Sequence, residues 1–157
     1  MHLLIRLIAD GTLVPIVLIG LYALVFMVAK KSRYEAYCRV LMAGLTALLV
    51  AKLMAQLYHP TGERPFEVLG LTADAAYLPN PGFPSDHALF ATAITYAVWA
   101  ETHSKKLAIL LAVLTVVMCI GRVLALVHTP LDIVGGMVAA TVGAGWYLTR
   151  LPAKKHK

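Results

Sequence analysis

The stretch from Pro81 to His87 places a hydroxyl, a carboxylate and an imidazole at the start of a predicted helix. Ser85 is a favoured N-cap residue, and the apolar run after His87 is expected to continue as helix. A helix that begins here directs its free backbone N–H groups and the positive end of its dipole outward. Phosphate is a common ligand of such a helix start. The sequence therefore predicts a phosphate site, where Asp86 either favours the helix start or tunes His87.

A second group of chemistry-bearing residues comprises Arg122, His128 and Asp132. In a helix, His128 and Asp132 would share one face, so the carboxylate could bond one imidazole nitrogen and leave the other free as base or nucleophile. Arg122 could place its guanidinium on the same anion. With His87 as a second imidazole, this set suits phosphoryl transfer, in which one histidine attacks phosphorus and the other protonates the leaving oxygen.

A metal ion is the competing explanation for two histidines and two aspartates. Three cationic side chains are expected near the same site, and they would repel a metal: Lys52, Arg64 and Arg122. We therefore expect no metal and no other cofactor. Charges at membrane depth cost about 2.5–3.5 kcal/mol each on insertion scales, which favours a functional reason for them.

The elements that must position these residues are membrane helices. Hydrophobic residues make up 60% of the 157 residues and charged residues 14%, against about 45–50% and 25% in soluble domains. The length indicates a single domain, residues 1–157. The net charge of +6 could suggest nucleic-acid binding, but the basic residues cluster in loops between apolar spans. That distribution is typical of membrane topology, so we expect a bilayer partner and no nucleic acid.

We expect an all-α, polytopic membrane helix bundle of about five transmembrane helices plus a short N-terminal interfacial helix. The interfacial helix covers residues 2–9 and is expected to end at Asp10-Gly11. The predicted spans are residues 12–29, 40–58, from the 81–87 stretch to about 100, 107–127 and 131–149. Gly135-Gly136 and the Gly143–Gly145 segment indicate close helix packing in the last span.

The distribution of the 14 lysines and arginines predicts the orientation. Ten of them fall in the 30–39 loop, the 101–106 connection and the C-terminal tail, and three fall on the other side. By the positive-inside rule, the first set and the C-terminus are cytoplasmic. The candidate site residues then face outward together.

Three blocks of the sequence, taken together, resemble a known signature. They are Arg64-Pro65, the Pro84–His87 tetrapeptide, and Gly121-Arg122 followed at fixed spacing by His128 and Asp132. This arrangement is similar to the KxxxxxxRP, PSGH and SRxxxxxHxxxD blocks of the type 2 phosphatidic acid phosphatase (PAP2) superfamily. The residues around the blocks are most similar to bacterial undecaprenyl-diphosphate phosphatases of the PAP2 type, which act in cell wall biogenesis.

The resemblance implies roles for the individual residues. His128 would be the nucleophile that forms a phosphohistidine, Asp132 would orient it, and His87 would be the general acid. The phosphoryl oxygens would be bound by a group in which we include Lys52, Arg64, Ser85, Asp86 and Arg122, with the backbone N–H groups after Ser85. The resemblance further implies an integral lipid phosphatase of the bacterial inner membrane that needs no metal and faces outward.

The sequence departs from the family pattern at several positions. Eleven residues separate Lys52 from Arg64 where the family has six, so either Lys52 reaches the site, His59 substitutes for it, or the lysine role is absent. Asp86 replaces a glycine and Gly121 replaces a serine. The first of the six spans common in the family corresponds here to the interfacial helix.

Other functions stay open on the sequence. Phosphatidate or phosphatidylglycerophosphate is the second choice of substrate after undecaprenyl diphosphate. A lipid phosphotransferase would use the same residues and pass the phosphoryl group to a second lipid. A small membrane transporter or lipid-binding protein, with the charges as its pathway, is the non-enzymatic alternative, and the three spaced blocks argue against it.

Overall fold

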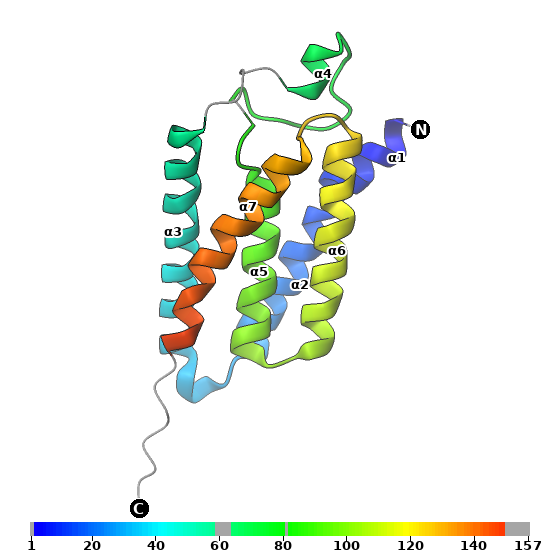
Figure 1. Cartoon of the computed structure of the whole chain (residues 1–157). Helices are drawn as coiled ribbons and strands as arrows, with labels where there is room; N and C mark the ends of the chain where they lie inside the picture. Colours follow the sequence, from blue (N-terminus) through cyan, green and yellow to red (C-terminus); the bar gives the residue numbers. More distant parts are fainter. Residues whose placement is uncertain (1, 59–63, 81, 150–157) are drawn as a thin grey trace, which may run out of the picture.

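The computed structural model describes residues 2–58, 64–80 and 82–149, and every regular element in these ranges is helical (Figure 1). This confirms the all-α prediction. The elements are α1 (His2–Arg6), η1 (Leu7–Gly11), α2 (Leu13–Phe26), η2 (Lys30–Ser32), α3 (Arg33–Leu57), α4 (Pro65–Val68), α5 (Asp86–Thr102), α6 (Lys105–Leu124), α7 (Pro130–Gly143) and η3 (Ala144–Thr149).

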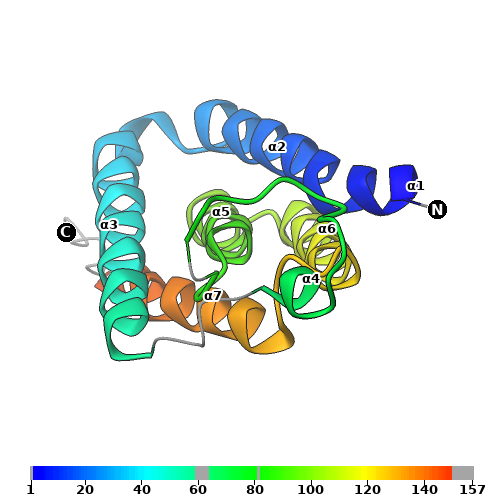
Figure 2. The ribbon, with the colours of Figure 1, turned by 90° about the horizontal axis from the view of Figure 1, so that it is seen from above.

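Helix α5 stands at the centre of the bundle, with α2, α3, α6 and α7 around it (Figure 2). Its small residues Ala88 and Ala91 are fully buried and let the neighbouring helices approach closely. The outer helices contribute the remaining core, Ile16, Ala23, Leu111, Met118, Cys119 and Ile133 among others. Their outward faces carry exposed leucines, isoleucines and valines such as Leu45, Ile109 and Val134. Such faces are expected where lipid, not water, surrounds the bundle.

Four stretches of the described residues are long and apolar enough to cross a membrane, where five were predicted. They are His2–Phe26, Lys30–Leu57, Lys105–Leu124 and Pro130–Thr149. The remaining predicted span corresponds to α5, which has 17 residues. The four stretches together make the chain a multi-pass membrane protein.

The N-terminal segment differs from the prediction that a helix ends at Asp10-Gly11. Helix α1 passes through η1, a π-helical turn that includes both residues, directly into α2. The turn packs against α6 and buries Ala9 completely. Tertiary packing thus overrides the local tendency of Asp-Gly to end a helix.

Glycines of α7 bring its backbone against two neighbours, as predicted. A Cβ atom at Gly136 would collide with the carbonyl oxygen of Ser85, and one at Gly143 would collide with that of Ala43. Gly135 lies equally close to the ring of Phe83. Among the described residues nothing lies within 4 Å of a Cβ atom at Gly145, so the prediction does not hold there. These contacts fix α7 against α3 and against the start of α5.

Candidate active site

Arg64 enters the site from the segment just before α4. Pro65 occupies the first position of that short helix, and the carboxylate of Glu67 accepts a hydrogen bond from the Arg64 backbone N–H at 2.6 Å. The Arg64 side chain is almost completely buried. Its Nη1 donates to the Val127 carbonyl at 2.6 Å, and its Nη2 donates to Oδ1 of Asn80 at 2.7 Å. The guanidinium is therefore held between two loops before any substrate arrives.

The start of α5 has the predicted form. Ser85 is the N-cap, and its Oγ accepts a hydrogen bond from the Ala88 N–H at 3.5 Å. Its backbone N–H donates to the Asp132 carbonyl at 2.9 Å, which ties α5 to the start of α7. Asp86 and His87, in the first turn, are partly buried. The cap therefore fixes the positions on the helix from which the Asp86 and His87 side chains extend.

The turn between α6 and α7 places His128 outside any helix, which corrects the expectation of a shared helical face with Asp132. Thr129 is the N-cap of α7 and Pro130 follows it. Asp132 closes a capping box, since its Oδ2 accepts from the Thr129 N–H at 2.7 Å. The N-cap with proline after it is a strong helix start, so the helix cannot extend back to His128.

The His128 imidazole nevertheless lies between Asp132 and Arg122. Its Nδ1 is 3.6 Å from the Asp132 Oδ2, and its Nε2 is 3.3 Å from Nη2 of Arg122. Because a guanidinium can only donate, Nε2 must be the unprotonated acceptor in this arrangement. The neutral ring then carries its proton on Nδ1, toward Asp132. This leaves a lone pair on Nε2, as a nucleophile requires.

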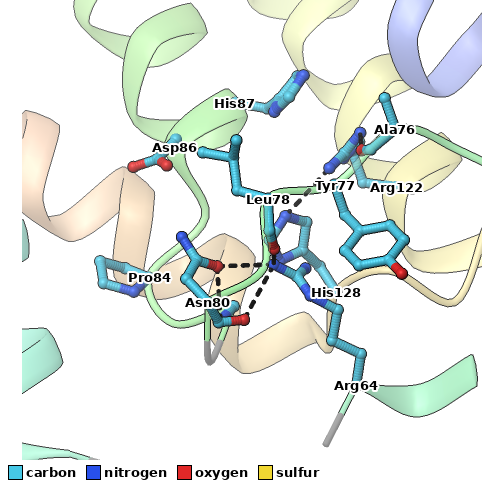
Figure 3. Close-up of a pocket in the computed structure, with 11 residues that line it drawn as sticks. Arg64, Ala76, Tyr77, Leu78, Asn80, Pro84, Asp86, His87, Arg122 and His128 are labelled. Carbon is cyan, nitrogen blue, oxygen red and sulfur yellow. Dashed lines mark hydrogen bonds between the residues drawn. The ribbon is translucent and has the colours of Figure 1, made fainter. Parts of the chain in front are cut away.

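Burial lowers the pKa of His128 from its ordinary value, and the positive charges of Arg122 and Arg64 act in the same direction. The contact with Asp132 opposes them. The net effect favours the neutral imidazole near neutral pH. Figure 3 shows the ring between the guanidinium groups of Arg64 and Arg122.

A cavity of about 180 Å³ joins these elements (Figure 3). Its walls come from residue 64, the 76–80 and 82–84 segments, the start of α5, the end of α6 and the turn before α7. The lining residues are Arg64, Ala76, Tyr77, Leu78, Asn80, Gly82, Pro84, Asp86, His87, Arg122 and His128. Two histidines and two arginines, predicted from three separate sequence blocks, thus share one cavity.

The other predicted residues lie elsewhere. Ser85 and Asp132 are buried and do not line the cavity; the Ser85 N–H is bonded to the Asp132 carbonyl, and the Asp132 carboxylate lies 3.6 Å from His128. Lys52 is exposed on α3 and is not among the described residues that line the cavity. His59, the alternative to it, lies outside the described residues. Within the described ranges, no three metal-ligating side chains gather closely enough to hold a metal ion.

Sequence reasoning missed two polar residues that contact the site arginines. Asn80 holds Arg64, as described above, and Asp10 accepts a hydrogen bond from Nη1 of Arg122 at 2.7 Å. Asp10 is a carboxylate inside an otherwise apolar stretch, which could have marked it as a partner for a buried cation. Asn80 lies among loop residues, where nothing in the sequence distinguishes it.

Comparisons with known proteins place the chain in a family. A model of the PAP2 superfamily matches residues 36–156, which include every cavity residue. The chain is also 31% identical over 135 residues to an Escherichia coli (strain K12) protein named "Putative undecaprenyl-diphosphatase YbjG". The match covers 84% of this chain and 63% of that relative, so the chain spans less than two thirds of the relative's length. No solved structure gives a significant match.

Proposed function

Since the chain belongs to the PAP2 superfamily, we propose that it is an integral membrane lipid phosphatase that hydrolyses undecaprenyl diphosphate through a phosphohistidine intermediate. The observation that carries this proposal is the single cavity shared by His87, His128, Arg64 and Arg122. Nucleophile, acid and anion-binding groups are the parts that phosphoryl transfer needs. The name of the Escherichia coli relative supports the choice of lipid.

In the proposed first step, Nε2 of His128 attacks the terminal phosphorus. The bond between phosphorus and the bridging oxygen breaks, and His87 gives that oxygen its proton. The products are a phosphohistidine and the lipid monophosphate. Asp132, 3.6 Å from Nδ1, stabilises the imidazolium character that develops on the ring.

In the second step, water replaces the imidazole on phosphorus. His87, now without its proton, removes a proton from that water, and inorganic phosphate leaves. Arg64 and Arg122 neutralise the phosphoryl oxygens in both steps, so their fixed charges supply what a metal supplies in other phosphatases. Both arginines are buried, which strengthens their attraction for the anion.

The remaining phosphate-binding candidates act less directly. Ser85 caps α5, so that the free N–H groups of the first turn and the helix dipole point at the bound anion. Asp86 lines the cavity and would repel an anion at close range, so we assign it to the placement of His87. Lys52, outside the cavity, receives no role in this mechanism.

The bundle would cross the membrane five times, with α5 as the span that the other helices enclose. The 27–32 and 103–104 connections and the end of η3 lie at one end of the bundle, opposite the start of α5 (Figure 1), which lines the cavity. Basic residues gather at that end, among them Lys30, Lys31, Lys105 and Lys106. By the positive-inside rule this end is cytoplasmic, and the cavity faces outward from the bacterial inner membrane.

A substrate panel tests the proposal. The full chain is purified in detergent with EDTA, and phosphate release is measured from undecaprenyl diphosphate, phosphatidate and phosphatidylglycerophosphate. We expect the highest kcat/KM for undecaprenyl diphosphate and no release by the His128→Ala variant. A higher kcat/KM for phosphatidate or phosphatidylglycerophosphate would identify that lipid as the substrate in place of undecaprenyl diphosphate. Full activity of His128→Ala would refute the mechanism.

A further inference from the structure

Asp10, at the N-terminal edge of the bundle, is bonded to a cavity residue 112 positions away in the sequence. Its Oδ1 accepts a hydrogen bond from Nη1 of Arg122 at 2.7 Å. The Arg122 side chain is 1% exposed, whereas the Asp10 side chain is 25% exposed. A guanidinium buried to this degree needs a counter-charge, and among the described carboxylates Asp10 alone pairs with it.

The fold brings Asp10 to this place by an unusually close contact between η1 and α6. A Cβ atom at Gly121 would lie 2.7 Å from Cγ2 of Ile8 and 2.8 Å from the backbone nitrogen of Ala9. Any other residue at position 121 would push the π-helical turn away from α6. The glycine, where the family pattern has serine, therefore permits the approach that seats Asp10 beside Arg122.

The contact is one side of a closed ring of three hydrogen bonds. Oδ2 of Asp10 accepts from the Ala76 N–H at 2.9 Å, and the Ala76 carbonyl accepts from Nη1 of Arg122 at 2.8 Å. Ala76 belongs to the loop that lines the cavity. Asp10 thus fixes the arginine and the loop to each other by using both of its carboxylate oxygens.

The ring occupies Nη1 of Arg122 and leaves Nη2 and Nε, and of these two Nη2 is the donor that faces His128. Nη1 of Arg122 is occupied by Asp10 and Ala76, whereas Nη2 faces Nε2 of His128 at 3.3 Å. A phosphoryl group on Nε2 would therefore meet Nη2. We propose that Asp10 is a positioning residue for phosphoryl transfer, which holds Arg122 so that Nη2 meets the phosphoryl group in the transition state. This inference rests on the proposed function.

Steady-state kinetics of Asp10→Asn test the proposal. The amide keeps the size of the side chain and removes the charge that holds Nη1. We expect kcat to fall by about 10- to 100-fold, because small displacements of a catalytic group have effects of this size. We expect KM to change by less than about 3-fold, since the interaction strengthens in the transition state.

Asp74→Asn is the matched control. Asp74 also links the N-terminal segment to the 73–77 loop, through His2 Nδ1 at 2.8 Å, but it does not line the cavity. We expect this variant to keep the wild-type kcat. An equal loss in both variants would mean that the loop tether, and not Arg122, accounts for the effect, and would overturn the proposal.

A double-mutant cycle separates positioning from a general structural role. If Asp10 acts through Arg122, then adding Asp10→Asn to Arg122→Ala should lower kcat by no more than about 2-fold further. Thermal unfolding in detergent is measured for all four proteins, and kcat is compared at a temperature where each is folded. Independent, multiplicative losses would contradict the proposal.

Orthovanadate binding, measured by calorimetry in detergent, separates this inference from the proposed function. Pentacoordinate vanadate imitates the transition state, so Asp10→Asn should bind it about 10-fold more weakly than the wild type. Vanadate binding with this loss, but without phosphate release from any lipid, would reject the lipid phosphatase and keep the role of Asp10. Unchanged vanadate binding and kcat in Asp10→Asn would reject the role of Asp10 alone.

Discussion

Two arginines at opposite ends of the bundle, one partly buried and one buried, show how the same side chain serves structure or chemistry. At the end away from the cavity, Arg39 of α3 donates two hydrogen bonds of 2.8 Å to the two oxygens of Glu101 in α5. In the cavity, Arg122 shares only Nη1 with a carboxylate oxygen. Among the described residues its Nε has no hydrogen-bond partner, and its Nη2 faces His128.

The two arginines differ in which of their N–H donors stay available to a ligand. A bidentate pair satisfies both charges and joins two helices, as expected of a structural contact. An arginine with an unmatched buried donor costs free energy in the absence of a ligand. Such a cost at a cavity is what we expect of a residue that waits for an anion.

The largest effect that we expect at a single helix concerns His87, in the first turn of α5. His87→Ala should lower kcat by about 10²- to 10⁴-fold, because a general acid contributes that much. His103→Asn, at the C-cap of the same helix, is the control, since asparagine also tolerates the positive φ of 56° there. Phosphate release is measured for both variants. An equal loss of kcat in both would contradict the role of His87 as general acid.

Arg122→Lys should lower kcat by about 10²-fold, because one ammonium cannot bond Asp10, Ala76 and a phosphoryl group in the same fork geometry. The matched Arg39→Lys variant should keep its kcat and lose thermal stability instead. Kinetics and thermal unfolding of the two variants test the comparison directly. A kcat loss in Arg39→Lys equal to that in Arg122→Lys would contradict the division into a structural and a phosphate-binding arginine.

Glu101→Ala should destabilise the folded protein by about 1–3 kcal/mol, since it leaves the partly buried Arg39 without its bidentate partner. Among the folded molecules, kcat should stay at the wild-type value. The double variant Arg39→Met/Glu101→Leu should recover most of the stability. Denaturation in detergent measures the free energy of unfolding of the single and the double variant. If the double variant does not regain stability, the pair does more than join α3 to α5.

The acid side of the pH–rate profile should show the smallest effect. Only neutral His128 can attack, and the pKa of His128 lies below its ordinary value of 6.5 because of burial and the nearby arginines. Activity should therefore persist below pH 6.5 and fall only as pH drops through the lowered pKa. The same sign holds for stability, which this group supports above pH 6.5 and ceases to support below its folded pKa. An acid limb of kcat/KM with its midpoint above pH 6.5 would contradict this, whereas loss of the His87 proton would lower activity on the alkaline side.

Local signals predicted much of this architecture. The Ser85 cap and the close contacts of Gly136 and Gly143 depend on neighbouring residues or on residue size, and they were found where expected. The prediction that His128 and Asp132 share a helical face was wrong, because the Thr129 cap starts α7 after His128. The pair still meets, since the turn folds the ring back toward the helix start.

The missed contacts are those that depend on distant parts of the chain. Asp10 and Arg122 are 112 positions apart, and their pairing follows from the close packing of η1 on α6 at Gly121. No periodicity reports such a contact in advance. Lys52 shows the opposite case, because its charge suggested a site residue while the rotation of α3 leaves it exposed.

The proposed mechanism depends most on His128 as the covalent nucleophile. Undecaprenyl diphosphate carrying ³²P in its terminal phosphate is mixed with the enzyme and quenched in alkali within a single turnover, and the labelled residue is identified by mass spectrometry. We expect label on His128 that is stable to base and labile to acid, and no label in His128→Ala. Rapid turnover by the wild type without labelled histidine at any quench time would contradict the account.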